Sequence, residues 1–135
     1  MTTDQRVRTL TEPECLTRLE RSVIGRVAWN TVDGPQILPV TYRVHHRAIV
    51  FRTSAHGALA ELARPRKAAF EVDEYDLIDR TGWSVLVSGH SGSGTRPDDL
   101  IRLWSEADPG PWAGGTRNVF ITIRMDVVTG RLVGP

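Results

Sequence analysis

The spacing of apolar residues changes several times along the chain, and each change predicts a new element. Leu16, Leu19 and Val23 recur at helical intervals behind Thr11 and Glu14, which have the spacing of a capping box. We therefore expect a short helix near the N-terminus. Downstream, β-branched and aromatic residues alternate with polar ones over short runs, which predicts strands at 26–32, 36–44, 48–51, 67–73, 82–90 and 118–125.

Turn-forming and acidic residues separate these runs. Asp33 and Gly34 predict a tight hairpin turn, and Pro39 inside the second strand marks an edge, a bulge or a place where a ligand replaces a neighbouring strand. The acidic stretch 73–79 is interpreted as a solvated loop and Gly92–Gly94 as a flexible break. A second helix is expected at 97–104, followed by a loop at 108–115.

Short strands, hairpins and brief helices together favour one architecture. We predict a mainly β fold, a six-stranded antiparallel barrel that is closed or nearly closed, as a single domain over residues 1–135. A doubly wound sheet is disfavoured because long crossover helices are missing from the pattern. Since a small barrel has little interior space, a sizeable ligand would lie outside it, most naturally in a groove between two copies.

Composition narrows the possible partners. The formal net charge is +1, which gives no bulk electrostatic argument for nucleic acid or an acidic membrane surface. Cys15 is the only cysteine, so neither an intrachain disulfide nor a cysteine metal cluster is expected, and the four histidines lack metal-ligand spacing. The first residues lack an apolar signal core and no apolar run is long enough to cross a bilayer, so we expect a cytoplasmic protein without membrane partners.

Candidate chemistry is concentrated where the third strand ends. The apolar run ending at Phe51 is followed by Arg52, Thr53, Ser54 and His56 and then by helix-forming residues at 58–63. One fixed charge, two hydroxyl groups and a helix start would suit a phosphate group. An ordinary polar turn with a helix cap explains the same residues, so both interpretations remain open. A Gly-x-Ser-x-Gly elbow before a helix and a Gly-x-Gly-x-x-Gly run are both missing, which disfavours hydrolase and Rossmann dehydrogenase functions.

Taken in order, several of these segments resemble a known family. The ordered set resembles the pyridoxamine 5'-phosphate oxidase-like flavin-binding split-barrel family, and within it the small nitroimidazole-reductase-like branch. The resemblance runs from about Leu10 to Leu132 and implies a split β-barrel homodimer with two flavin sites at the subunit interface. The segments that carry it are 25–28, 35–42, 49–53, 69–73 and 81–89.

The resemblance also implies roles for particular residues. It places the flavin phosphate at the end of the third strand, the isoalloxazine ring along the backbone of the second strand, and a contribution from the partner subunit between Trp112 and Arg117. No side chain is expected to act as a catalytic acid or base. The implied cofactor-binding residues are Pro39, Val40, Thr41, Tyr42, Phe51, Arg52, Thr53, Ser54, His56, Trp112 and Arg117.

The family likeness therefore predicts an FMN-dependent oxidoreductase acting on a small aromatic, nitro or quinone-like acceptor. One position departs from the pattern, because Ala58 stands where many flavin-binding relatives carry a lysine. Without that cation, two alternatives remain open. The cofactor could be the deazaflavin F420, and the protein could instead be a non-catalytic dimer that binds or sequesters a flavin, F420 or haem.

Overall fold

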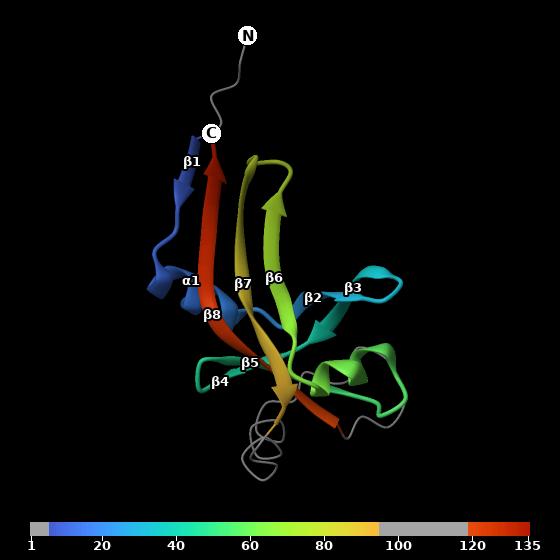
Figure 1. The fold of residues 1–135 in the computed structure, drawn as a ribbon. Helices are drawn as coiled ribbons and strands as arrows, with labels where there is room; N and C mark the ends of the chain where they lie inside the picture. The colour runs from blue at the N-terminus through green and yellow to red at the C-terminus, as the bar shows by residue number, and fades with distance from the viewer. Residues whose placement is uncertain (1–5, 95–118) are drawn as a thin grey trace.

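The computed structural model describes residues 6–94 and 119–135 (Figure 1). In these two ranges the chain forms an eight-stranded sheet with one α-helix and one 3₁₀ helix. The elements in chain order are β1 (Arg6–Thr9), α1 (Glu12–Arg21), β2 (Ile24–Thr31), β3 (Gly34–Thr41), β4 (Arg43–His45), β5 (Ala48–Thr53), η1 (Ala58–Ala63), β6 (Lys67–Asp76), β7 (Thr81–Ser93) and β8 (Val119–Gly134).

All strand pairs are antiparallel, and they make one curled sheet. The order across it is β3-β2-β6-β7-β8-β5-β4, with β1 added to the free side of β8. Figure 1 shows β6, β7 and β8 rising together as a long ladder, while the β2–β3 and β4–β5 hairpins cross beneath it. The two ends of the sheet approach each other where β3 contacts β5, a place that we call the seam. This is the split barrel expected from the sequence, and it contains two more strands in the described residues than the six predicted.

Helix α1 forms as its sequence predicts. The Thr11 hydroxyl accepts a hydrogen bond from the Glu14 N–H at 3.3 Å, and the Glu14 carboxylate accepts one from the Thr11 N–H at 3.0 Å, which completes a capping box. Cys15 and Leu19, on one side of the helix, are fully buried. The helix is therefore fixed at its start by two reciprocal hydrogen bonds and along its length by burial of one face.

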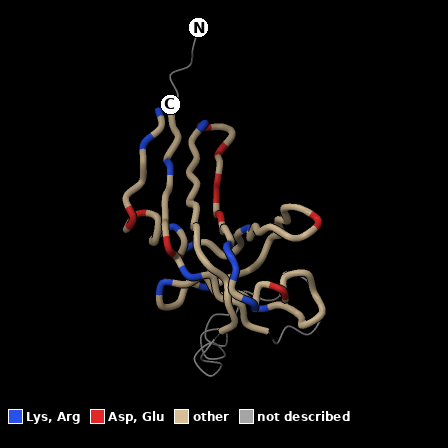
Figure 2. Tube along the Cα trace, in the orientation of Figure 1, with Lys and Arg blue, Asp and Glu red and all other residues tan. Residues whose placement is uncertain are grey.

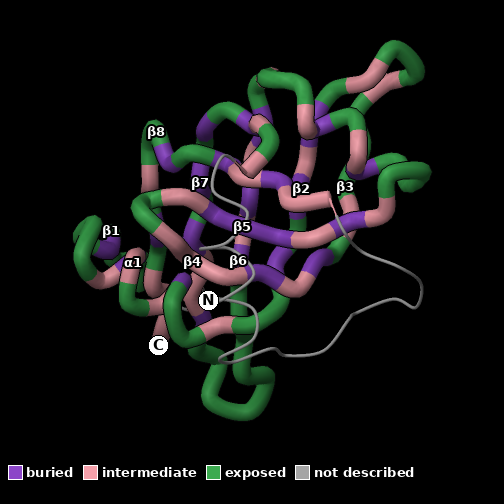
Figure 3. The backbone as a smooth tube through the Cα atoms, turned by 90° about the horizontal axis from the view of Figure 1, so that it is seen from below, coloured by how far each residue is buried: buried purple, intermediate pink, exposed green. Residues whose placement is uncertain are grey.

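The centre of the barrel is packed by large side chains on the inner face of the sheet. The rings of Phe70 and Tyr42 meet edge to face with centroids 4.7 Å apart. A Cβ on Gly25 would lie 2.2 Å from the Phe70 ring, so only glycine leaves room for that ring. The Tyr42 hydroxyl donates to the Leu19 carbonyl at 2.5 Å, and burial raises the pKa of this phenol. Figure 3 shows buried residues running along the middle of the strands, with exposed residues at the tips.

The predicted acidic loop at 73–79 was wrong in its first half. Residues 73–76 complete β6, and the turn comes afterwards, at 77–80. The Asp76 carboxylate accepts the N–H groups of Ile78 and Asp79 at 2.9 and 3.0 Å and so holds that turn. The mistake has a physical cause: this end of β6 is exposed along its whole length, so its residues carry no apolar alternation.

Other boundaries also differ from the expectations. Strand β7 continues through the predicted break to Ser93, β8 continues past Met125 to Gly134, and β1 was not predicted. In β8 a bulge at Asp126 explains the error, because Ser88 pairs with Val127 and Gly89 with Met125. The extra residue reverses which residues of β8 face inward. The alternation of apolar and polar residues in the sequence is therefore interrupted at this point, although the strand continues. The helix expected at 97–104 and the loop at 108–115 lie outside the described residues. Within those residues, no helix is long and apolar enough to span a bilayer.

Candidate functional site

One side of the seam is the outer edge of β3, which pairs only with β2. Pro39 lies opposite Arg26 in a pair whose backbone groups point away from each other, so the missing proline N–H costs the β2–β3 ladder no hydrogen bond. Antiparallel pairs alternate in whether their backbone groups face the partner strand, and the Tyr42 N–H does turn inward, to the Val23 carbonyl at 3.1 Å. The N–H of Thr41 and the carbonyl of Pro39 therefore face outward, toward the seam.

The side chains of β3 divide into a buried and an exposed set. Val40 and Tyr42 are 5% and 1% exposed and belong to the core, whereas Pro39 is exposed and Thr41 half-buried. By the same alternation the backbone N–H and carbonyl groups of Val40 and Tyr42 face β2, so a ligand in the seam would meet the backbone of Pro39 and Thr41 instead. The backbone role that the resemblance implies for this strand therefore falls to Pro39 and Thr41 and stays a prediction.

The other side of the seam is the end of β5. The ladder between β4 and β5 stops at the pair of Arg43 with Val50, and Arg52 lies beyond it. Phe51 and Thr53 are 0% and 2% exposed and point into the barrel, whereas the half-buried Arg52 points to the opposite face of the strand. The structure thus separates the Arg52 guanidinium from the Thr53 hydroxyl, two groups that the sequence placed together.

A closed turn follows β5. The Ser54 hydroxyl accepts from the His56 N–H, and the Ser54 carbonyl accepts from the Gly57 N–H, both at 3.2 Å. His56 itself is exposed, and the segment that follows is the six-residue 3₁₀ helix η1. The helix expected at 58–63 is therefore present, but it is a short 3₁₀ turn rather than an extended α-helix. The two partner-side residues of the prediction, Trp112 and Arg117, lie outside the described residues.

Charge is distributed unevenly around these elements. Figure 2 shows acidic residues following β6 above the barrel, while the β4–β5 hairpin carries a basic segment. At the base of β6, Arg26 binds both Glu71 and Asp73, at 2.9 and 3.0 Å. The pKa of the Glu71 carboxyl is raised, first by its burial and then by the neighbouring Asp73. Arg26 thus partly neutralises the acidic side of the molecule, and it is also the cross-strand partner of Pro39 on β3.

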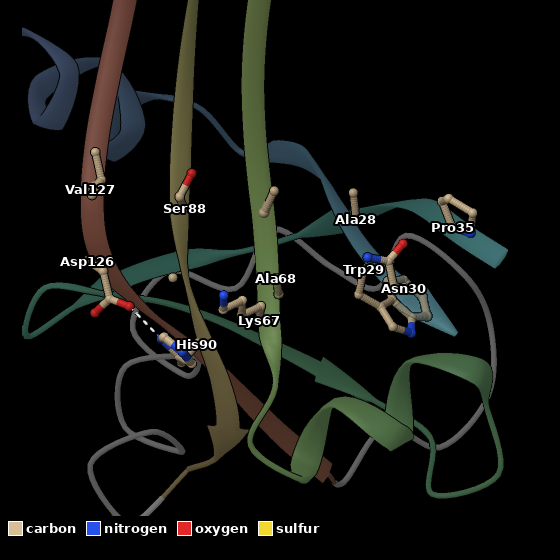
Figure 4. Close-up of a pocket in the computed structure, with 12 residues that line it drawn as sticks. Ala28, Trp29, Asn30, Pro35, Lys67, Ala68, Ser88, His90, Asp126 and Val127 are labelled. Carbon is tan, nitrogen blue, oxygen red and sulfur yellow. Dashed lines mark hydrogen bonds and ion pairs between the residues drawn. The ribbon is translucent and has the colours of Figure 1, made fainter. Parts of the chain in front are cut away.

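A second concave region lies on the outer face of the sheet, where no site was predicted from the sequence. It is a hollow of about 470 Å³ over β2, β6, β7 and β8 (Figure 4). Its floor is a row of residues in register across the four strands, in which Ala28 pairs with Ala69, Ala69 with Ser88 and Ser88 with Val127. Short side chains in the middle of this row leave the space open.

Three charged or titratable residues meet at one end of this hollow. The His90 imidazole Nδ1 and an Asp126 carboxylate oxygen are 2.5 Å apart, and the other oxygen accepts from the Arg124 Nε at 2.9 Å. The hydrogen bond from His90, followed by that from Arg124, lowers the pKa of Asp126. His90 and Asp126 are 36 residues apart in sequence, and the bulge in β8 places the carboxylate beside the ring. Periodicity alone could not have paired them, because the bulge breaks the register.

Known proteins with similar sequences and structures support the split-barrel fold. The family described as pyridoxamine 5'-phosphate oxidase matches residues 11–132. The Mycobacterium tuberculosis protein Rv0080 is 28% identical over 111 residues, which cover 78% of this chain and 72% of that protein. A candidate pyridoxamine 5'-phosphate oxidase of Corynebacterium glutamicum superimposes with a TM-score of 0.77 at 29% identity, covering 98% of this chain and 97% of the other.

A third similarity is to a solved structure with a named ligand class. The FAD binding protein from Mycobacterium smegmatis has a TM-score of 0.74 at 25% identity, covering 93% of this chain and 98% of that one. The family match spans nearly the whole chain and coincides with the segments quoted from the sequence. The chain therefore belongs to the pyridoxamine 5'-phosphate oxidase family.

Proposed function

We propose that this protein binds a flavin in the seam between β3 and β5 and uses it as an oxidoreductase. The observation that carries the proposal is the outer edge of β3, where backbone donors and acceptors face away from β2. The pyrimidine edge of a flavin has an N–H between two carbonyl groups, so it can bind to a strand edge of this kind. The similarity to the FAD binding protein from Mycobacterium smegmatis supports the same ligand class.

The phosphate end of the cofactor would lie at the end of β5. The Arg52 guanidinium provides the positive charge, and Ser54 and His56 follow it in the turn. Thr53 would contribute through its backbone, since its side chain is enclosed with Phe51. A guanidinium next to a polar turn fits a phosphate monoester, which favours FMN; F420 has a phosphate diester instead and is the alternative.

In this proposal the cofactor, and not a side chain, carries out the redox chemistry. A bound flavin would supply hydride or electron transfer, and the protein would bind it, orient it and limit access to its ring. The acceptor would be a small aromatic, nitro or quinone-like molecule lying against the exposed face of the ring. No described side chain needs to act as a catalytic acid or base in this scheme.

A second copy of the chain would complete the site. Large apolar side chains lie exposed on the outer face of the sheet, among them Ile37 at 61% and Val127 at 56%, and burial of this face would favour a homodimer. Trp112 and Arg117 are the residues that the second copy is proposed to bring to the seam. Light scattering of the purified protein tests this part, and a monomer at micromolar concentration would contradict it.

The decisive experiment concerns Arg52. Titration with FMN, FAD and F420 should show binding to the wild-type protein, and Arg52→Ala should weaken binding of the preferred cofactor about tenfold or more, because a charge-assisted contact is lost. Arg131→Ala, which removes an exposed arginine on β8, is the matched control and should leave the affinity unchanged. Equal affinities in the two variants would contradict the phosphate role of Arg52.

A binding protein without turnover is the second candidate, and Ala58 favours it. Lys67 is the only lysine of the chain and lies on β6, so no lysine side chain supports the phosphate from the turn or η1. The two functions differ in one measurement. An oxidoreductase should pass electrons from NAD(P)H or from reduced F420 to an acceptor such as menadione, whereas a binding protein should hold the cofactor without accelerating that transfer.

A further inference from the structure

The hollow on the outer face of the sheet is separate from the seam, and its shape has a simple origin. Two rows of longer side chains flank the floor row: Lys67 and His90, which line the hollow, and Arg26 and Glu71, which lie beyond its lining. Between them runs the floor row that includes Ala69 and its partners. Its volume, about 470 Å³, lies within the range of about 300–1,000 Å³ usual for small-molecule sites.

The floor is flat because its residues are short and one of them cannot be longer. A Cβ on Gly89, which also lines the hollow, would lie 1.7 Å from the Arg124 carbonyl oxygen, so the close approach of β7 and β8 excludes a side chain there. Next to it, Ala28 and Ala69 present only methyl groups. A flat surface of methyl groups and backbone suits the face of a planar ring.

Charge is unequal at the two borders. The Arg26 guanidinium is compensated by two carboxylates, those of Glu71 and Asp73. On the opposite border, Lys67 and His90 are cross-strand partners on the same face, and Figure 4 shows both side chains at that end of the hollow. Lys67 makes no ion pair with any of the residues that the structure describes. This border therefore carries uncompensated positive charge.

Among the residues that the structure describes, Asp126 is the carboxylate that lines the hollow, and both of its oxygens already accept hydrogen bonds. One is bound by the His90 Nδ1 and the other by the Arg124 Nε. With Nδ1 held in this way, the other ring nitrogen of His90, Nε2, is the one left for a ligand. Asp126 thus positions the imidazole, and its negative charge is offset by the Arg124 guanidinium.

We propose that this hollow binds a planar aromatic carboxylic acid, with its ring on the floor formed by Ala28, Ala69 and Ser88 and its carboxylate toward Lys67. The site goes beyond the proposed flavin function and does not depend on it. A floor of short side chains would accept any flat apolar group. The positive charge at the Lys67 border favours a ligand that also carries a carboxylate. If a second copy covers the outer face, the hollow becomes an enclosed cleft with the same lining.

The test uses two probes of the same shape and different charge, 4-nitrobenzoate and 4-nitrobenzamide. Isothermal titration of the full-length protein should show that the acid binds at least about tenfold more tightly than the amide, since only the acid forms a charge-assisted contact. Lys67→Met should remove most of that difference and leave the amide unaffected. Arg131→Met, which removes one exposed positive charge elsewhere on the same sheet, should change neither affinity.

Two further variants separate the floor from the border. Ala69→Leu should abolish binding of both probes by filling the floor, with unfolding by denaturant as the check that the protein remains folded. His90→Gln should change the preference for the acid much less than Lys67→Met does. The proposal is overturned if neither probe binds, if acid and amide bind equally, or if Lys67→Met and Arg131→Met behave alike.

A competition experiment between FMN and 4-nitrobenzoate tests whether the hollow and the flavin site are separate. FMN at saturation should leave 4-nitrobenzoate binding intact, and Lys67→Met should leave FMN binding intact. Displacement of the acid by FMN would mean that the hollow is part of the flavin site and would overturn the separate site. Acid binding without any flavin binding would instead refute the flavin proposal alone.

Discussion

The inner and outer faces of the sheet differ in the size, polarity and burial of their side chains. On the inner face of β6, Phe70 and Val72 are fully or almost fully buried, whereas on its outer face Ala69 and Glu71 remain half-exposed. Inner residues are large and apolar and pack tightly. Outer residues are mixed: some are short, some are charged, and some, such as Leu86 and Val127, are large, apolar and exposed. The inner face thus determines the fold, while the outer face and the seam leave surface that a ligand or a second copy can use.

The contrast is sharpest between two neighbouring residues of β6. Phe70→Ala should destabilise the protein by about 3–5 kcal/mol, because it removes a fully buried ring that contacts Tyr42 and fills the space above Gly25. Ala69→Ser, one residue away on the outer face, should change stability by no more than about 0.5 kcal/mol. Denaturant unfolding measures both. A loss below about 1 kcal/mol for Phe70→Ala would show that the inner face does not determine stability in this way.

A smaller effect is expected where the two faces meet, at the bulge. Gly89→Ala should cost about 1–3 kcal/mol, because a methyl group there would collide with the backbone of Arg124 and force β7 and β8 apart. Gly92→Ala is the matched control, since a Cβ at that position has no neighbour within 4 Å among the described residues. Equal stability of the two variants would mean that the ladder relaxes easily at the bulge.

Most of the fold could be predicted from the sequence because inner and outer residues alternate regularly. The capping box at Thr11, the hairpin turn after Thr31 and the alternating run of β7 each depend on neighbouring residues only. The errors come from places where a local rule fails. The bulge at Asp126 hid half of β8, and the exposed end of β6 looked like a loop.

The candidate sites were less predictable because they depend on contacts between distant segments. The sequence places Arg52 and Thr53 on opposite faces of a strand end, but it does not show how close β3 comes to that end. Likewise, it contained no sign that His90 meets Asp126, since that contact requires both the β7–β8 register and the extra residue in β8. Alternation predicts which face a residue occupies, whereas a site needs the lateral register between strands.

The smallest predicted effect concerns a residue on neither face of the sheet. The hydrogen bond from Arg8, followed by those from Thr11, lowers the pKa of the exposed Glu14 from about 4.5 to about 2. Because the folded protein holds this proton less tightly than the unfolded chain, the stabilisation is complete above about pH 4.5 and is lost as the pH falls toward about 2.

Glu14→Gln should therefore lower the unfolding midpoint slightly at pH 7 and leave it nearly unchanged near pH 2, which flattens its fall between pH 5 and pH 2. Glu20→Gln, on the same helix, is the control, because no described ion pair involves Glu20. Thermal unfolding at low salt, repeated with added salt, measures the difference, and added salt should reduce it because the Arg8–Glu14 pair is exposed. A Glu14→Gln profile as steep as that of the wild type would show that the cap contributes nothing to acid sensitivity. The inner face would then account for the stability of the fold without help from its first helix.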